Sequence, residues 1–128
     1  MKQISRYDPA HAPDPKGWLS MDEAERIELV LTFHRHAKER LPSPQLHATL
    51  HVIVENQVAL GDEIPVRRTI ERLQAEGLGR HDAVHAVGSV LAKQVFDLLN
   101  ERRSEANLNL AYTAELEELS AERWRRAR

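Results

Sequence analysis

Apolar side chains recur along most of the chain at intervals of three and four residues, the spacing that lines one face of an α-helix. Residues 1–19 instead carry three prolines and little apolar periodicity, which predicts an irregular N-terminal arm. No stretch keeps the strict alternation of a β-strand. The chain is therefore expected to be all-α, an up-and-down bundle of four to five helices. The predicted helices cover about residues 20–41, 44–60, 65–76, 80–103 and 108–126.

Capping residues and helix breakers set the expected ends of these helices. Ser20 with Glu23 forms a capping box at the start of the first helix, and Pro42 ends that helix. Ser43 followed by Pro44 is a favoured start for the second helix. A glycine follows the second helix and another follows the third. The connections are short, so successive helices are expected to run antiparallel.

Composition and charge narrow the class of protein. The chain has 128 residues, 41% apolar and 30% charged, typical of one globular domain, which we place at 20–128 after the arm at 1–19. Its formal net charge of −2 does not favour nucleic acid or a membrane surface as partner. The chain lacks cysteine, a bilayer-spanning apolar run and a secretory leader pattern. These features predict a cytoplasmic protein whose metal ligands are nitrogen and oxygen atoms.

Two pairs of histidines share the same spacing. His47 and His51 lie four residues apart in the second predicted helix, and His81 and His85 repeat that spacing in the fourth. Side chains four residues apart project from one helix face, so each pair can hold one metal ion. Both pairs lie in the first turns of helices that an up-and-down bundle makes parallel. The pairs are therefore expected in one layer, as parts of one metal site.

Two further residues extend this candidate site. His34 lies in the last turns of the first predicted helix and so reaches the same layer, although a core histidine bonded to a carbonyl or to Glu55 is an equal alternative. Glu55 is eight residues beyond His47, about 12 Å along the helix axis, so the two cannot easily bind one ion. Glu55 then either orients an imidazole or belongs to a second metal shared through His51. The remaining two histidines are expected to be solvated.

The ligand types restrict the metal and leave its use open. Imidazole suits zinc, iron, copper or nickel, and we expect zinc or iron. If all four paired histidines bind, the site is closed and structural. If three bind beside a water, hydrolysis becomes available, with Glu55 or Asp82 as candidate base. Without a metal, the chain would be a helical protein-interaction module. The catalytic residues are unknown at this stage, and a protein partner or a homo-oligomer is left open.

The sequence around the second histidine pair is similar to two enzyme motifs. His81-Asp82-Ala83-Val84-His85 has the form of the zinc-peptidase motif H-E-x-x-H, with aspartate in place of glutamate. Aspartate is one methylene shorter, and no strand is expected to hold an extended peptide, so a peptidase is disfavoured. The pair His81-Asp82 also resembles ligands of HD-type phosphohydrolases. Those need a distant aspartate, and Asp97 lies about 22 Å further along the same helix, which excludes this interpretation.

The chain carries its motifs in a fixed order, from a proline through Leu46-His47-x-x-Leu50-His51 and Glu55-x-Gln57 to His81-Asp82-Ala83-x-His85. This series resembles the bacterial domain of unknown function family eighteen-forty-one. The resemblance covers about residues 42–103 and extends more weakly to 119. That family has glutamate at the position of Asp82 and a different N-terminal region. The resemblance implies a small helical bacterial protein and supplies no activity.

Overall fold

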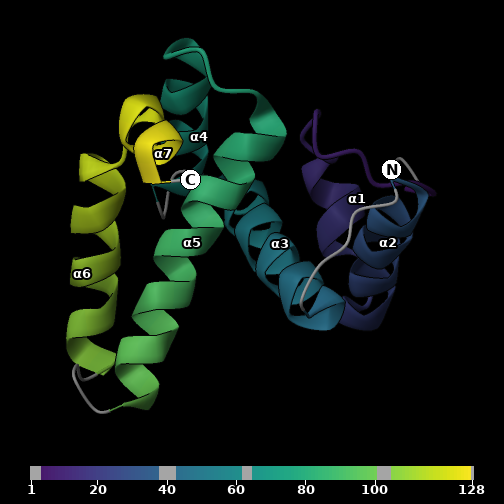
Figure 1. Ribbon diagram of the computed structural model, residues 1–128. Helices are drawn as coiled ribbons and strands as arrows, with labels where there is room; N and C mark the ends of the chain where they lie inside the picture. Colours follow the sequence, from purple (N-terminus) through teal and green to yellow (C-terminus); the bar gives the residue numbers. More distant parts are fainter. Residues whose placement is uncertain (1–3, 38–42, 62–64, 101–104, 128) are drawn as a thin grey trace.

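The computed structural model describes residues 4–37, 43–61, 65–100 and 105–127, and for residues 105–109 only the backbone. Regular structure in these ranges is entirely α-helical, which confirms the predicted all-α class (Figure 1). None of the described helices combines the length and apolar character needed to cross a bilayer. The helices are α1 (Pro15–Leu19), α2 (Glu23–His36), α3 (Pro44–Ala59), α4 (Val66–Ala75), α5 (Arg80–Leu99), α6 (Glu105–Glu118) and α7 (Ala121–Ala127).

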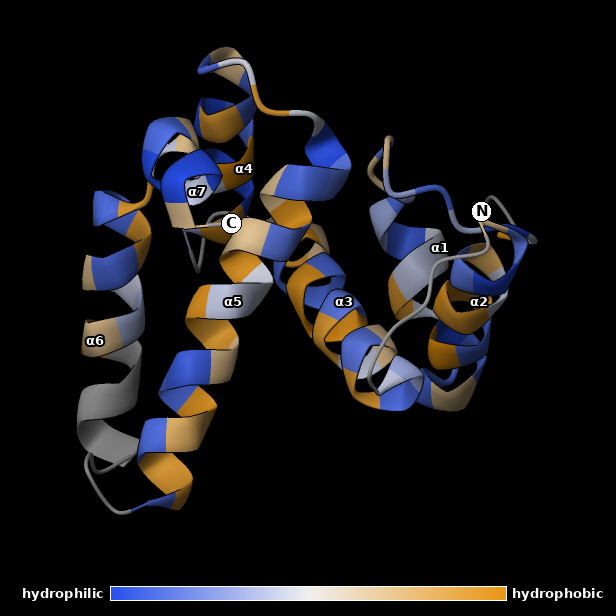
Figure 2. Cartoon of the chain, in the orientation of Figure 1, coloured by the Kyte–Doolittle hydropathy of each residue, from blue (hydrophilic) through white to orange (hydrophobic). Residues whose placement is uncertain are grey.

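Helix α3 stands at the centre of the bundle, between α1 and α2 on one side and α4 and α5 on the other (Figure 1). It supplies buried side chains to two apolar cores. Ala48 and Val52 pack with residues of α1, α2 and the N-terminal arm. Val54 and Val58 pack with residues of α4, α5, α6 and α7. Hydrophobic and hydrophilic positions alternate along α5, as expected of an amphipathic helix packed on several neighbours (Figure 2).

The N-terminal arm contains a short helix, α1, that the apolar pattern did not predict. Asp14 caps this helix by accepting a hydrogen bond from the Gly17 amide at 2.9 Å, and Pro15 occupies the first helical position. The Ser20 hydroxyl donates to the Gly17 carbonyl at 2.9 Å and closes the helix. The aspartate followed by proline was a sequence signal for this start, but the helix is too short to show periodicity.

The start of α2 differs from the expected one because Ser20 belongs to the end of α1. Helix α2 begins at Glu23, with Asp22 as its N-cap. Asp22 and Glu25 form the capping box, in which the Asp22 amide donates to Glu25 at 3.4 Å. The same motif type therefore operates two residues later than predicted. Helix α2 ends at His36 with Ala37 as its C-cap, earlier than predicted, and Pro42 itself lies outside the described residues.

The ends of α3 and α4 agree with the sequence signals. Ser43 accepts a hydrogen bond from the Leu46 amide at 3.4 Å and caps α3. Gly61 follows α3 with a φ of 85°, and Gly77 follows α4 with a φ of 97°. Glycine adopts this left-handed backbone region without the steric cost of a Cβ, which explains both helix stops.

The last predicted helix is divided in two. Helix α6 ends at Glu118, and α7 begins at Ala121 after two non-helical residues. The Ser120 hydroxyl accepts a hydrogen bond from the Arg123 amide at 3.1 Å, so it caps α7. This cap lets α7 turn across the end of the bundle, where Figure 1 places it near α4. The predicted extension of α5 to residue 103 lies outside the described residues.

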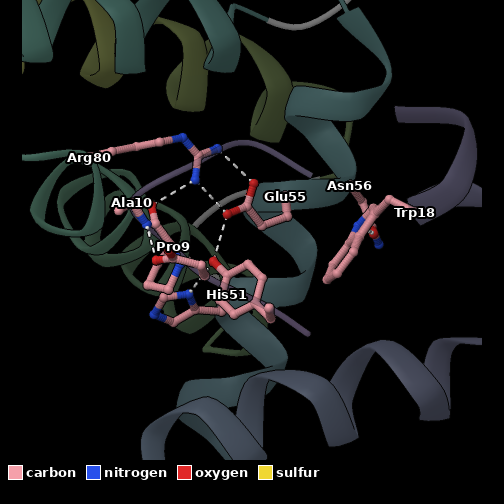
Figure 3. A network of polar contacts seen from close by, with 9 residues as sticks. Pro9, Ala10, Trp18, His51, Glu55, Asn56 and Arg80 are labelled. Carbon is pink, nitrogen blue, oxygen red and sulfur yellow. Dashed lines mark hydrogen bonds and ion pairs between the residues drawn. The ribbon is translucent and has the colours of Figure 1, made fainter. Parts of the chain in front are cut away.

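The N-terminal arm is fastened to the bundle by two buried aromatic side chains. Tyr7 is 4% exposed and Trp18 is 0% exposed, and their ring centroids lie 5.8 Å apart. The Trp18 indole donates to Asn56 of α3 at 2.8 Å, a contact visible in Figure 3. Arg26 of α2 donates to the same Asn56 oxygen at 2.9 Å. These contacts hold the arm against α3 and place Tyr7 beside the histidines.

Candidate metal centre

Five imidazoles from three helices meet between α2, α3 and α5. The ring centroids of His34 and His47 are 4.6 Å apart, and those of His81 and His85 are 4.2 Å apart. His51 lies 4.9 Å from His34 by the same measure. The structure therefore brings all five histidines of the expected layer into contact. The four-residue spacing on α3 and α5 produces this, because it places each pair on the helix face turned toward the centre.

The ring nitrogens of these histidines converge more closely than the rings. The Nε2 atom of His47 lies 3.1 Å from Nε2 of His34 and 3.1 Å from Nε2 of His85. The His85 atom lies 2.9 Å from Nε2 of His51. Imidazole–metal bonds are about 2.0–2.1 Å long, so neighbouring nitrogens on one ion lie about 2.9–3.4 Å apart. The observed separations fall within this range.

Four of the five histidines form the inner group, and His47 joins it from the edge. His34, His51, His81 and His85 each place one ring nitrogen within 4.8 Å of the other three. His34 and His51 are buried, whereas His47, His81 and His85 are half-buried. His47 does not belong to the inner group, although its Nε2 is close to two members. We call the five residues the histidine cluster.

Neighbouring acceptors determine which ring nitrogen carries the hydrogen in two of the imidazoles. The Nδ1 atom of His34 lies 2.9 Å from the carbonyl oxygen of Val30, which only accepts hydrogen bonds, so Nδ1 carries the hydrogen. The Tyr7 hydroxyl donates its hydrogen to Glu55 at 2.6 Å and therefore accepts from Nδ1 of His51 at 3.0 Å. In neutral His34 and His51, Nε2 then bears a lone pair directed into the cluster.

Hydrogen bonds alone cannot account for the close Nε2 contacts. An Nε2 atom carries at most one hydrogen, and those of neutral His34 and His51 carry none. The contact of His34 with His47 then needs the hydrogen on His47, and the contact of His51 with His85 needs it on His85. The remaining 3.1 Å contact, between His47 and His85, would set two N–H groups against each other. A cation that accepts all these lone pairs removes the conflict.

A buried ion pair between Glu55 and Arg80 is linked through Tyr7 to His51 of the cluster (Figure 3). Arg80 donates from Nη1 to Oε2 of Glu55 at 2.9 Å and from Nη2 to Oε1 at 2.8 Å. It also donates to the Pro9 carbonyl of the arm at 3.0 Å. Glu55 is 1% exposed and Arg80 7%. With Tyr7 as a third donor, both Glu55 oxygens accept hydrogen bonds, and the carboxyl group is held in one orientation.

Burial and neighbouring charge set the protonation of these groups. Burial, with the negative charge of Glu55, raises the pKa of Tyr7 well above its usual value of 10.0. The Arg80 side chain is buried too, yet its hydrogen bonds to Glu55 raise the pKa of its guanidinium. Burial, with the adjacent imidazoles of His85 and His47, moves the pKa of His51 far below 6.5. His51 is therefore neutral at pH 7, the form that binds metal.

An open pocket of about 390 Å³ leads from the surface to the cluster. Its walls are largely apolar and come from α3, α5 and α7. Among the described residues, the lining consists of His47, Leu50, His51, Val84, His85, Gly88, Ser89, Ala92 and Trp124. Three imidazoles of the cluster thus line this pocket, while His34 and His81 are not part of its lining.

Sequence reasoning missed three residues around the site. Tyr7 lies in the arm, where no periodic pattern relates it to a helix, and Arg80 precedes the second histidine pair without forming a motif with it. Trp124 belongs to a basic segment that reads as a solvated tail, yet it is half-buried and lines the pocket. Of the two candidate bases, Glu55 faces Arg80 and Tyr7, and Asp82 lies half-buried in the first turn of α5. Neither belongs to the pocket lining.

Comparisons of the chain with protein-family models, with curated proteins and with solved structures find no match. The resemblance noted in the sequence stays a prediction. Function is therefore inferred from the geometry of the histidine cluster.

Proposed function

We propose that this protein binds one transition-metal ion, zinc or iron, through the Nε2 atoms of the histidine cluster. The observation that carries the proposal is the set of three Nε2 contacts at 2.9–3.1 Å joining His34, His47, His85 and His51. When His34 and His51 are neutral, no placement of one hydrogen per Nε2 atom turns all three contacts into hydrogen bonds. An ion bound by these lone pairs removes that conflict.

The contacts of the Glu55 carboxylate favour one bound ion over two. A second ion would need further donors, and the sequence offered Glu55 for that purpose. Both Glu55 oxygens are held by Arg80 and Tyr7 instead. Glu55 then acts on the metal through Tyr7 and His51, keeping the His51 ring oriented with Nε2 toward the ion. Metal-binding imidazoles commonly donate their other ring N–H to a supporting group of this kind, which strengthens the bond to the metal.

The number of imidazoles bears on the choice between the two metals. Structural zinc sites are almost always four-coordinate and tetrahedral, so zinc would take the inner group and leave His47 at the edge. Iron accepts five or six ligands, takes imidazole readily and would engage all five residues. Access from the pocket favours a metal that meets a small molecule over a purely structural one. A hydrolytic role gains less support, because Glu55 does not face the pocket.

The test is the metal content of protein purified without a histidine tag. A His51→Ala/His85→Ala double variant removes two cluster members. The matched control is His11→Ala/His36→Ala, which removes two exposed histidines outside the cluster. About one equivalent of metal is expected in the parent and the control, and almost none in the cluster variant. A parent that stays metal-free after incubation with Zn²⁺ and anaerobic Fe²⁺ would refute the proposal, as would equal metal content in both variants.

A further inference from the structure

The lining of the pocket beside the histidine cluster combines three imidazoles with mainly apolar side chains. His47, His51 and His85 supply the imidazoles, and most of the remaining lining is apolar or small, namely Leu50, Val84, Gly88, Ala92 and the indole of Trp124. The one hydroxyl in the lining, that of Ser89, donates to the Ala86 carbonyl at 2.7 Å. Among the described lining residues there is no lysine, arginine, aspartate or glutamate.

Charge at the metal site selects the head group of a ligand. A divalent ion bound by neutral imidazoles keeps both of its positive charges. The nearby carboxylate of Glu55 does not offset them, because it is already paired with Arg80. A partly buried, uncompensated cation favours an anionic ligand in its coordination sphere. The apolar wall then selects a ligand whose remaining part is uncharged.

From this arrangement we infer that the pocket binds a small monocarboxylate, with its carboxylate on the metal and its apolar body against Leu50, Val84 and Trp124. The inference rests on the proposed function, because the metal, bound with one coordination position open to the pocket, supplies the site for the head group. A volume of about 390 Å³ suits a short aliphatic or aromatic acid. A dicarboxylate or a sugar acid would place additional polar groups against a lining that is mostly apolar.

A substitution at Gly88 can fill the pocket without removing a candidate metal ligand. Gly88 lies on α5 between His85 and Ala92, and a Cβ atom built on it meets nothing within 4 Å. A leucine at this position therefore extends into open space within the pocket. Glycine is also the poorer helix former, so the substitution carries no cost in helix propensity.

The experiment uses protein loaded with Co²⁺, whose visible absorption bands change when a ligand enters its coordination sphere. Sodium hexanoate is titrated against sodium acetate, which has the same head group without the body, and 1-hexanol, which has the body without the anion. Hexanoate is expected to shift the bands at a concentration at least tenfold below that of acetate, because its methylenes leave water. Hexanol is expected to leave the bands unchanged.

Two pocket variants and one control locate the binding. Gly88→Leu and Ala92→Leu each fill the pocket, and each should keep about one equivalent of cobalt while losing the tenfold preference for hexanoate. Ala114→Leu adds the same side chain at an exposed position of α6 and should behave like the parent. If the parent binds cobalt but responds equally to acetate and hexanoate, the pocket inference is overturned and the metal proposal stands. A parent that binds no cobalt overturns both.

Discussion

The Tyr7 hydroxyl donates a 2.6 Å hydrogen bond to Oε2 of Glu55, although 48 positions separate the two residues in the chain. The same hydroxyl oxygen accepts from Nδ1 of His51. One side chain of the N-terminal arm thus links a buried carboxylate to a member of the histidine cluster. The arm is therefore part of the site, and substitutions in the arm should change the affinity for a bound metal.

Replacing Tyr7 with phenylalanine tests this link. Tyr7→Phe removes the acceptor for Nδ1 of His51 and one donor to Glu55, while the ring still fills its buried place. Loss of such a supporting contact weakens metal binding by about 10–100-fold. Competition of the loaded protein with a chelator of known affinity measures the change. Tyr112→Phe is the matched control, because Tyr112 is also buried and donates one hydrogen bond, at 2.7 Å, to Gln57 away from the cluster. Equal affinities in the two variants would contradict the link.

The ion pair of Glu55 and Arg80 should dominate the stability of the metal-free protein near the site. Glu55→Gln leaves the guanidinium of Arg80 buried without its counter-charge. Breaking one side of a buried pair costs about 3–5 kcal/mol of unfolding free energy. Urea unfolding in the presence of a chelator measures it. Glu28→Gln breaks an exposed pair with Arg35 and should change the urea midpoint little. A small change in both variants would show that Arg80 regains water when Glu55 is neutralised.

The layer of histidines was predictable because it follows from local rules. Helical periodicity fixes which side chains share a face, and short connections make neighbouring helices antiparallel. His47 and His51 on α3, and His81 and His85 on α5, were therefore expected at corresponding levels, and the rings of the two pairs do meet. The contact itself still needed the faces of α3 and α5 to turn toward each other, and the apolar residues flanking each pair favour that rotation.

The support around the cluster was not predictable in the same way. Tyr7 reaches His51 only because the irregular arm folds back over α3, and irregular backbone has no period that a sequence pattern could reveal. Arg80 meets Glu55 through the packing of α5 on α3, across 25 positions of the chain. Periodicity placed Glu55 near the cluster but could not choose between binding a metal and orienting an imidazole. Its two partners decide this, and both come from other elements.

The lowered pKa of His51 predicts how the metal-free protein responds to acid. Above pH 6.5 the imidazole is neutral in both folded and unfolded chains, so it makes no pH-dependent contribution. Below pH 6.5 the His51 side chain binds a proton in the unfolded chain, whereas in the folded chain its lowered pKa keeps it neutral. The free energy of unfolding should therefore fall with decreasing pH, by about 1.4 kcal/mol per pH unit for one such group.

Urea midpoints between pH 7.5 and pH 5, with a chelator present, measure this slope. His51→Asn should flatten it, because the group that titrates differently in the two states is gone. His11→Asn changes an exposed histidine of the arm and should keep the parent slope. Identical slopes in all three proteins would mean that His51 accepts a proton in the folded state.

His47 differs from the other cluster members in a way that metal binding should reveal. The inner group of four retains a complete set of nitrogens within 4.8 Å when His47 is removed. His47→Gln is therefore expected to keep about one equivalent of metal and to bind it more weakly, whereas His51→Gln removes an inner ligand and should lose most of it. Metal content after gel filtration, followed by chelator competition, separates the two variants. If His47→Gln loses its metal as fully as His51→Gln, all five imidazoles are needed at once, which favours iron with five or six ligands over tetrahedral zinc.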